Sequence, residues 1–467
     1  MTLLRPVAAR AWRAAVSEAI ERRGERFGGA WATRDGGWRA VMLAGDEAVV
    51  LCCDAEDGRV DSIVDIAAAA LWDEREAHDL HGLGFIGHDP LRPLIEHTAE
   101  LERWVTPVSG EGVHQVAVGP IHAGVIESGH FRFHVVGERI LALDTRLFHK
   151  HRGLERAAEG LAPDDALKHA GRACAACAVA NTVAYAQAVE DATGLWPSAD
   201  LRRQRTVLLE LERLYNHLHD IGAICAGVGF APGSMAFAAL KDRAQELNAQ
   251  AFGHRFLFGT VAIGGMPVAL DPPAAGALRG ALRELRADAL AGWRDLTFAA
   301  SMQARLDGVG VLELEDALRM GVVGPAARAS GVPLDARVGN RRLVYGGLRP
   351  ASPPAATGDV AARLRIRALE LEATCDMLDE LLSLPLARDG ASPGRERSPV
   401  GVGRVESPRG ETVCTVELVA ARVARMHLRS ASYANWPAVA RATAGNLLPD
   451  FPLINKSFEL CYACADR

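Results

Sequence analysis

Four cysteines stand in two short pairs whose spacing suits a soft metal ion. Cys174 and Cys177 enclose two alanines, and Cys461 and Cys464 form a second Cys-x-x-Cys pair. Residues three apart lie on one face of a helical turn, so each pair can reach one metal. Thiolates are soft ligands, and four of them suit zinc, an iron–sulfur cluster or another soft transition-metal centre. A helix that begins at the first pair is expected to lower the pKa of the Cys174 thiol.

Two plainer interpretations of these pairs stay open at the level of the sequence. One is a structural zinc site, although zinc ribbons leave ~15–20 residues between their pairs and here the pairs lie far apart. The other is that the cysteines are core residues without a ligand. The five remaining cysteines have no partner at ligand spacing and are predicted to be small buried hydrophobic residues: Cys52, Cys53, Cys225, Cys375 and Cys414.

The composition describes a folded chain of more than one domain. It has 467 residues, of which 49% are hydrophobic and 24% charged, which is enough for a sizeable core. A net charge of −6 excludes a bulk basic field that would attract nucleic acid or anionic lipid. No apolar run reaches the ~18 residues of a membrane span, and the start lacks the apolar core of a secretory signal. We therefore expect a cytoplasmic chain whose cysteines are reduced.

The first part of the chain has mixed character. Residues 12–27 show the apolar spacing of an amphipathic helix, and 28–60 alternates short apolar runs with Gly and Asp, as hairpin strands do. A helical stretch over 63–79 leads into a loop rich in Gly and Pro. Residues 1–98 are therefore interpreted as a small α+β domain, and strands are predicted again over 112–146.

From about residue 150 onward the chain is predicted to be mainly helical. Residues 388–410 are rich in Gly, Pro, Ser and Arg and are expected to form a long loop. Strands are predicted over 411–432, and the tail over 444–467 is expected to be irregular. Gly194, followed by Pro197, predicts the end of one helix. Apolar residues recur every three or four positions in five windows: 175–193, 203–226, 234–251, 276–296 and 360–386.

The segments RACAAC and CYACADR around the two pairs resemble the nickel-ligand motifs of NiFe-hydrogenase large subunits. DEREAHDLHGLGFIGHDPLRPL resembles the thirty-kilodalton subunit of respiratory complex I. The resemblance covers roughly residues 60–467. Further segments resemble the membrane-bound, energy-converting branch, which includes the formate hydrogenlyase large subunit and is related to the forty-nine-kilodalton subunit of complex I: GPIHAGVIESGHFRFHVVGE, FHKHRGLE, ELERLYNHLHDIGAICAGVGF, GHRFLFG, GVVGPAARASG, SPRGE and SYANWP.

The resemblance implies an α+β fold class with two fused domains. Residues 1–98 are expected to resemble the thirty-kilodalton subunit of complex I. Residues 105–467 are expected to form a mainly helical hydrogenase large-subunit domain, like the forty-nine-kilodalton subunit, with peripheral strands.

A Ni–Fe centre is the cofactor that the resemblance implies, with CO and cyanide on its iron. In the family the first cysteine of each pair is a terminal nickel ligand and the second bridges nickel to iron. Cys174 and Cys461 are thus expected to be terminal ligands, and Cys177 and Cys464 bridging ligands.

Three more residues match family positions close to such a centre. Heterolytic cleavage of H₂ needs a metal and a base that takes the proton. Glu155, in HRGLE, matches the glutamate that relays protons from a terminal cysteine, which suits a carboxylate whose pKa burial raises. Arg409, in SPRGE, matches the arginine over the open metal face. Asp220 is interpreted either as the acidic partner of that arginine or as a helix-surface acid, and without the resemblance Glu155 and Arg409 would be interpreted as surface charges.

Other charged residues carry weaker expectations. Arg172 is expected to form an ion pair near the site, and Asp335 with Arg337 a structural pair. His122 and His130 flank a strand turn that approaches quinone and the adjacent cluster in complex I relatives, but isolated histidines are commonly hydrogen-bonded loop residues.

The implied function is that of a membrane-associated NiFe-hydrogenase, which cleaves H₂ reversibly or reduces protons. Electrons would be exchanged with a 4Fe–4S cluster in a partner subunit, since this chain has no further cysteine set. The implied partners are an Fe–S small subunit like the twenty-kilodalton subunit of complex I, a ferredoxin-like Fe–S subunit and membrane antiporter-like subunits. They would hold the chain on the inner face of the cell membrane.

Two other functions stay open, namely a non-catalytic coupling subunit of a complex I-like assembly and an H₂-sensing regulator. Retention of four cysteines favours the hydrogenase, because complex I homologues have lost them. Departures from the family pattern at Ala175, at Glu459-Leu460 and at Ser128 favour the coupling subunit. Family precursors are trimmed after the position of Arg467, so we expect a mature form or one encoded without an extension.

Overall fold

One twisted sheet organises the N-terminal region of the computed structural model, which describes residues 2–123, 126–346, 356–384, 390–394 and 397–467. Short apolar runs separated by Gly and Asp turns form an antiparallel meander, and the first strand adds to it in parallel, in the order β1-β4-β3-β2. Trp12, Trp38 and Leu51 fill the core between this sheet and its helices. The elements are β1 (Thr2–Val7), η1 (Ala9–Ala11), α1 (Trp12–Ser17), η2 (Glu18–Arg22), β2 (Arg26–Ala32), β3 (Gly37–Ala44), β4 (Glu47–Asp54), β5 (Arg59–Asp61), η3 (Ala68–Ala70), α2 (Leu71–His81) and β6 (Gly84–Ile86).

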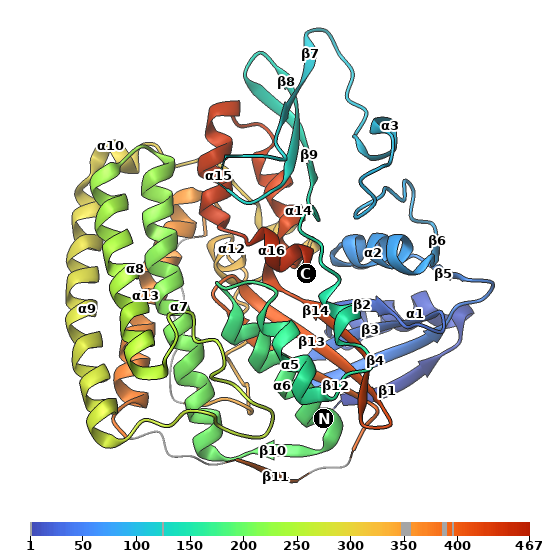
Figure 1. Cartoon of the computed structure of the whole chain (residues 1–467). Coiled ribbons are helices and arrows are strands. Elements are labelled where there is room, and N and C mark those ends of the chain that lie inside the picture. Colours follow the sequence, from blue (N-terminus) through green and yellow to red (C-terminus); the bar gives the residue numbers. More distant parts are fainter. Residues whose placement is uncertain (1, 124–125, 347–355, 385–389, 395–396) are drawn as a thin grey trace.

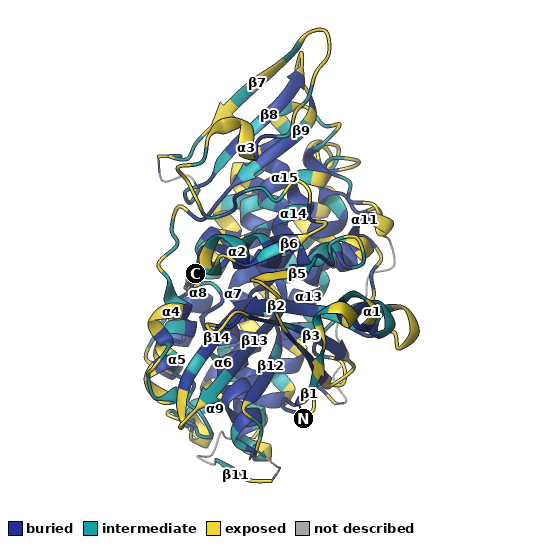
Figure 2. Cartoon of the chain, turned by 90° about the vertical axis from the view of Figure 1, so that its right-hand side faces the viewer, coloured by how far each residue is buried: buried dark blue, intermediate teal, exposed yellow. Residues whose placement is uncertain are grey.

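A three-stranded hairpin sheet follows and projects from the body of the molecule (Figure 1). Figure 2 shows that the edge strand β7 (Val113–Val118) carries exposed and half-buried residues, whereas the central strand β8 (His130–Val136) is mostly buried. Phe131 and Phe133 of the central strand pack on Phe451 of the C-terminal region. The elements are α3 (Leu101–Trp104), β7 (Val113–Val118), β8 (His130–Val136) and β9 (Arg139–Arg146).

Long helices build one side of the molecule, on the left of Figure 1. Side chains of Ser198, Asp271 and Asp359 cap three of them by accepting backbone N–H groups. α7 packs against α8 and α13, and α9 packs against α8 and α13. The elements are α4 (Leu154–Ala158), α5 (Pro163–Gly171), α6 (Ala178–Thr193), β10 (Leu195–Pro197), α7 (Ala199–Gly227), α8 (Ala231–Phe252), α9 (Pro272–Phe298), α10 (Ala300–Gln303), α11 (Leu314–Arg319), α12 (Gly324–Ala329) and α13 (Val360–Leu381).

A buried antiparallel sheet and short helices complete the chain. The sheet has the order β12-β13-β14, and α6 lies on its first strand. Gly401 and Gly403 allow this contact, because a Cβ atom at Gly403 would lie 1.8 Å from the Ala184 oxygen. The elements are β11 (Ala391–Pro393), β12 (Val400–Ser407), β13 (Gly410–Val419), β14 (Arg422–Arg429), α14 (Ala431–Thr443), η4 (Leu448–Asp450), α15 (Phe451–Phe458) and α16 (Tyr462–Asp466).

The structure confirms the α+β class and a long helix in each of the five predicted windows. The last helix ends at Leu381, before the predicted end, and residues 385–386 of its window lie outside the described residues. Gly194 ends α6 with a left-handed φ of 73°. The five isolated cysteines are buried or half-buried, as predicted. The domain division between residues 98 and 105 stays a prediction.

Three local predictions are wrong. The helix expected over 12–27 ends at Arg22, and Phe27 belongs to β2. The described part of the loop expected over 388–410 contains β11 and all of β12, because the glycines of β12 serve close packing rather than a turn. The tail expected to be irregular contains α15 and α16. Among the described residues, no helix combines the length and apolarity that crossing a bilayer requires.

Candidate metal centre

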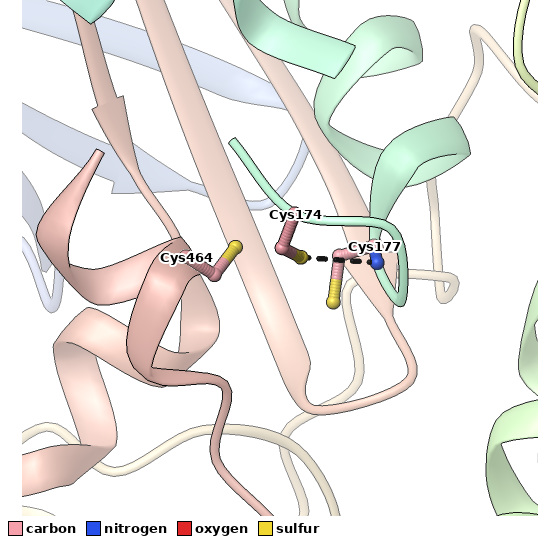
Figure 3. A group of neighbouring side chains, drawn as sticks. All are labelled: Cys174, Cys177 and Cys464. Carbon is pink, nitrogen blue, oxygen red and sulfur yellow. Dashed lines mark hydrogen bonds between the residues drawn. The ribbon is translucent and has the colours of Figure 1, made fainter. Parts of the chain in front are cut away.

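The two cysteine pairs meet where the start of α6 faces the C-terminal segment. Cys177 is the N-cap of α6, and Cys461 is the N-cap of α16. The sulfurs of Cys174, Cys177 and Cys464 lie within 4.8 Å of one another (Figure 3). Cys461 lines the same cavity as Cys174. Four sulfurs from two distant segments thus converge, and this donor set fits a soft metal centre.

The thiols at this site have pKa values that are shifted in opposite directions. Hydrogen bonds from Cys174, and then from Cys177 and Cys461, hold the pKa of the Cys464 thiol well below its usual range. Contacts with the other three sulfurs, together with burial, raise the pKa of the Cys174 thiol. The predicted lowering at Cys174 is therefore wrong. Cys174 Sγ does accept the Cys177 N–H at 3.2 Å (Figure 3), but the three neighbouring sulfurs and burial outweigh this bond.

Glu212 accepts two N–H groups from the first turn of α6, and sequence reasoning missed it. Its carboxylate receives the N–H groups of Val179 at 2.6 Å and Ala180 at 3.0 Å. Burial raises the pKa of Glu212 to about 8, even though these two hydrogen bonds act in the opposite direction. Asn216, one turn further along α7, donates to the Ala176 oxygen at 2.8 Å. α7 therefore fixes the loop that carries the first cysteine pair, through partners that no local pattern reveals.

Arg409 and Asp220 form a buried ion pair beside the cysteines. Arg409 Nη2 lies 3.0 Å from Asp220 Oδ1, and Arg367 Nε donates to Asp220 Oδ2 at 3.0 Å. Burial raises the pKa of Asp220, but the charge of Arg409 outweighs it and holds that pKa well below its usual range. Arg409 lines the cavity that contains Cys174 and Cys461. The surface alternatives for Asp220 and Arg409 are therefore wrong.

Glu155 is also buried, but its partners are not thiols. Arg467 Nη1 donates to its Oε1 at 2.7 Å, and the Leu428 N–H donates to the same oxygen at 2.8 Å. Burial raises the pKa of Glu155, yet the charges of Arg467 and then His427 outweigh it and hold that pKa well below its usual range. The expected raised pKa is wrong, and so is the surface alternative. In the part of the chain that the structure describes, no hydrogen bond joins Glu155 to a cysteine.

A different glutamate, Glu127, reaches the second cysteine pair. Its Oε2 lies 3.8 Å from Cys461 Sγ and accepts the Ala463 N–H at 2.9 Å. Lys150 Nζ lies 3.1 Å from its other oxygen. The side chain is 36% exposed, so it contacts both a thiol and solvent. Glu127 lies in the segment GVIESGHF, where sequence reasoning considered Ser128 and His130 but not this carboxylate.

A cavity of about 430 Å³ opens onto the cysteines from outside. The methyl group of Ala175 is exposed at this cavity rather than packed between the sulfurs. Glu459, which belongs to a second departure from the family pattern, still serves the site, because its backbone oxygen accepts from Arg409 Nε at 2.7 Å. Leu460 lines the same cavity, as do Ile126, Tyr215, His219, Lys241, Gln245 and Phe256.

The weaker expectations have mixed outcomes. Asp335 and Arg337 form the predicted pair at 2.8 Å. The guanidinium carbon of Arg172 lies 4.7 Å from the centre of the Phe258 ring. Arg172 has no salt bridge to any described residue, so its predicted ion pair is wrong. His122 and His130 each bond a backbone oxygen, at 2.7 and 3.1 Å, so both are hydrogen-bonded as predicted. The loop interpretation is confirmed for His122, whereas His130 is the first residue of β8. An approach of this turn to quinone stays a prediction.

Known proteins of two related kinds match the chain. The family described as "Respiratory-chain NADH dehydrogenase, 49 Kd subunit" matches residues 228–389 and 395–467, and the 30 Kd subunit family matches 39–108. Formate hydrogenlyase subunit 5 of Escherichia coli (strain K12) is 30% identical, covering 93% of this chain and 85% of its own length. Hydrogenase-4 component G of the same organism is 30% identical, with 89% and 77% covered.

Another relative and a solved structure agree with these matches. The membrane-bound hydrogenase subunit alpha of Pyrococcus furiosus is 28% identical, over 76% of this chain and 87% of its own length. The fold matches a chain of the membrane-bound sulfane sulfur reductase, an archaeal respiratory membrane complex, with a TM-score of 0.69 and 24% identity, over 78% of this chain and 100% of that one. The chain thus belongs to the family of the 49 Kd subunit of respiratory-chain NADH dehydrogenase, with a region like the 30 Kd subunit fused ahead, and is related to formate hydrogenlyase subunit 5 and hydrogenase-4 component G.

Proposed function

We propose that this protein is the catalytic large subunit of a membrane-associated NiFe-hydrogenase of the formate hydrogenlyase type. The observation that carries the proposal is the convergence of four cysteine sulfurs beside the buried Arg409–Asp220 pair. Cys174, Cys177, Cys461 and Cys464 would hold a Ni–Fe centre whose iron carries CO and cyanide. When bound, such a centre supplies the Lewis-acid and redox chemistry that heterolytic H₂ cleavage needs.

The chain's own residues would handle the proton and the small substrate. Glu127 is placed to accept a proton from the Cys461 thiol and pass it toward solvent, because it contacts both. Arg409 would orient the substrate in the cavity, and Asp220 fixes its guanidinium there. The raised pKa of Arg409 keeps it protonated, because the charge of Asp220 outweighs the effect of burial.

The partners that we propose for this subunit are inferred from the complexes to which its relatives belong. One relative is a subunit of a membrane-bound hydrogenase, and the matching solved structure is that of a respiratory membrane complex. An Fe–S small subunit with a 4Fe–4S cluster, a ferredoxin-like Fe–S subunit and membrane antiporter-like subunits would bind the chain and keep it on the cytoplasmic face of the membrane. H₂ and protons would be the substrates.

A second candidate is a non-catalytic coupling subunit of a complex I-like assembly. The C/D subunit of the NADH-quinone oxidoreductase of Phocaeicola vulgatus, at 26% identity over 70% of each chain, favours it. An H₂-sensing regulator would share the metal of a hydrogenase but show little turnover, so turnover separates the regulator from the hydrogenase.

Elemental analysis of the complex purified from its native host tests the proposal. We expect nickel, and iron beyond that of the clusters, at about one atom each per chain, together with H₂ turnover. Zinc or no metal would instead support the coupling subunit. The variant Cys461→Ser should lose nickel, while the matched control Cys375→Ala, at a buried cysteine of α13, should keep it. Unchanged nickel in Cys461→Ser would overturn the ligand assignment.

A further inference from the structure

Helix α2 of the N-terminal region places a carboxylate against the segment that carries the second cysteine pair. Glu76 is buried, and its Oε2 accepts a hydrogen bond from Arg467 Nη2. Arg467 lies three residues after Cys464 and is itself only 3% exposed. A buried guanidinium needs anionic partners, because removing it from water without them is strongly unfavourable.

Arg467 is enclosed on several sides. Its Nη1 donates to Glu155 Oε1 at 2.7 Å and to the Leu428 oxygen at 3.0 Å. Its guanidinium carbon lies 4.5 Å from the centre of the Tyr433 ring. Glu76 is the partner that comes from the N-terminal region. It completes a pair of carboxylates around one cation.

The segment between the cysteines and Arg467 is short and held at both ends. Ser430 Oγ donates to the Cys464 oxygen at 3.0 Å, and Asp466 Oδ1 accepts the Phe148 N–H at 2.8 Å. A displacement of Arg467 would therefore move the turn of α16 that carries Cys464. A cavity of about 390 Å³, lined by Glu76 and Arg467 among others, gives water access to this contact.

We propose that Glu76 is a positioning residue for the C-terminal cysteine pair, which acts by neutralising and fixing Arg467. The N-terminal region thereby holds the second half of the metal centre in place. The effect on metal retention rests on the proposed function, whereas the effect on the order of residues 459–467 does not.

The test compares two buried glutamates of the same helix in the purified complex. Glu76→Gln removes one of the two carboxylate charges that face Arg467, the one from the N-terminal region. Glu74→Gln is the matched control, because Glu74 is equally buried but bonds Ser62, Ile63 and His88, which all lie in the N-terminal region. Hydrogen–deuterium exchange of residues 459–467 and nickel content are measured for each variant.

We expect exchange in this segment to rise roughly tenfold and nickel content to fall in Glu76→Gln, while Glu74→Gln changes neither. Glu76→Asp, which keeps the charge, should restore part of the protection. Adding Glu76→Gln to Arg467→Gln should raise exchange no further, because Glu76 acts through Arg467.

Unchanged exchange in Glu76→Gln, or an equal rise in Glu74→Gln, would overturn the inference. If the wild-type complex contains no nickel, the proposed function fails. The exchange comparison would still decide whether Glu76 positions this segment.

Discussion

Glu127 and Glu155 both lie near the C-terminal segment, but they face different groups. Glu127 contacts the Cys461 thiol and is partly exposed, whereas Glu155 is buried among Arg467, Arg425 and a backbone N–H. A proton relay needs a thiol on one side and solvent on the other. Glu127 meets both requirements, whereas the strong stabilisation of the Glu155 carboxylate opposes its protonation.

The glutamates can be separated by H/D exchange with H₂ in the loaded complex. Glu127→Gln should lower the exchange rate at least ~100-fold while metal content stays unchanged, since a general acid–base group contributes about that much. Glu155→Gln should lower exchange only as far as it lowers metal content. If Glu155→Gln alone abolished exchange at full metal content, the relay would belong to Glu155, as the sequence predicted.

At the scale of elements, the contact between α6 and β12 sets the position of the first cysteine pair. Gly403→Ala would force a methyl group to within 1.8 Å of the Ala184 oxygen and 2.7 Å of the Ala188 nitrogen, so α6 would have to move. We expect a loss of unfolding free energy of about 3 kcal/mol or more, because overpacking against backbone relaxes poorly. Urea denaturation measures it.

The control for this substitution is Gly280→Ala in α9. Within the described ranges, no heavy atom lies within 4 Å of a Cβ added at Gly280, apart from its chain neighbours and its own helix backbone. Alanine is a better helix former than glycine by about 0.5–1 kcal/mol, so the control should stabilise the chain. Destabilisation of similar size in both variants would show that the α6–β12 contact is not the cause.

At the scale of the whole molecule, charged side chains join the N-terminal region to the rest. His427 of β14 lies 3.7 Å from Asp73 of α2 and 3.5 Å from Glu155 of α4. Burial lowers the pKa of His427, but the charge of Glu155 and the contact with Asp73 outweigh it, and the pKa is raised above its ordinary 6.5. Glu76 adds to this effect. The protonated imidazole therefore stabilises the folded state.

This contact predicts a pH dependence of stability. A histidine whose pKa is raised on folding contributes fully below about pH 6.5, and the contribution is lost as the pH rises through the folded pKa. The difference in urea midpoint between wild type and His427→Gln should therefore shrink as the pH rises from 6 to above neutrality. His114→Gln, on the exposed strand β7, should show no such trend. A constant difference for His427→Gln would contradict the assignment.

The features that could be predicted from the sequence are those set by residues close together in the chain, and the features that could not are set by residues far apart in it. The five long helices follow from apolar spacing, a property of neighbouring residues. β12 was mistaken for loop because Gly401 and Gly403 resemble turn glycines until α6 lies against them. The helix predicted over 12–27 ends earlier, at Arg22, because Phe27 fits the apolar spacing of a helix as well as the alternation of a strand.

The sequence by itself determined the fold class, the two cysteine pairs and the family, because motifs and periodicity depend only on the order of residues along the chain. Only the tertiary structure decided which charges meet. It paired Asp220 with Arg409 across 189 positions, Glu127 with Cys461 across 334, and Glu76 with Arg467 across 391. Electrostatic interactions act over a few ångströms in space and depend on burial, and neither quantity can be read from the order of residues.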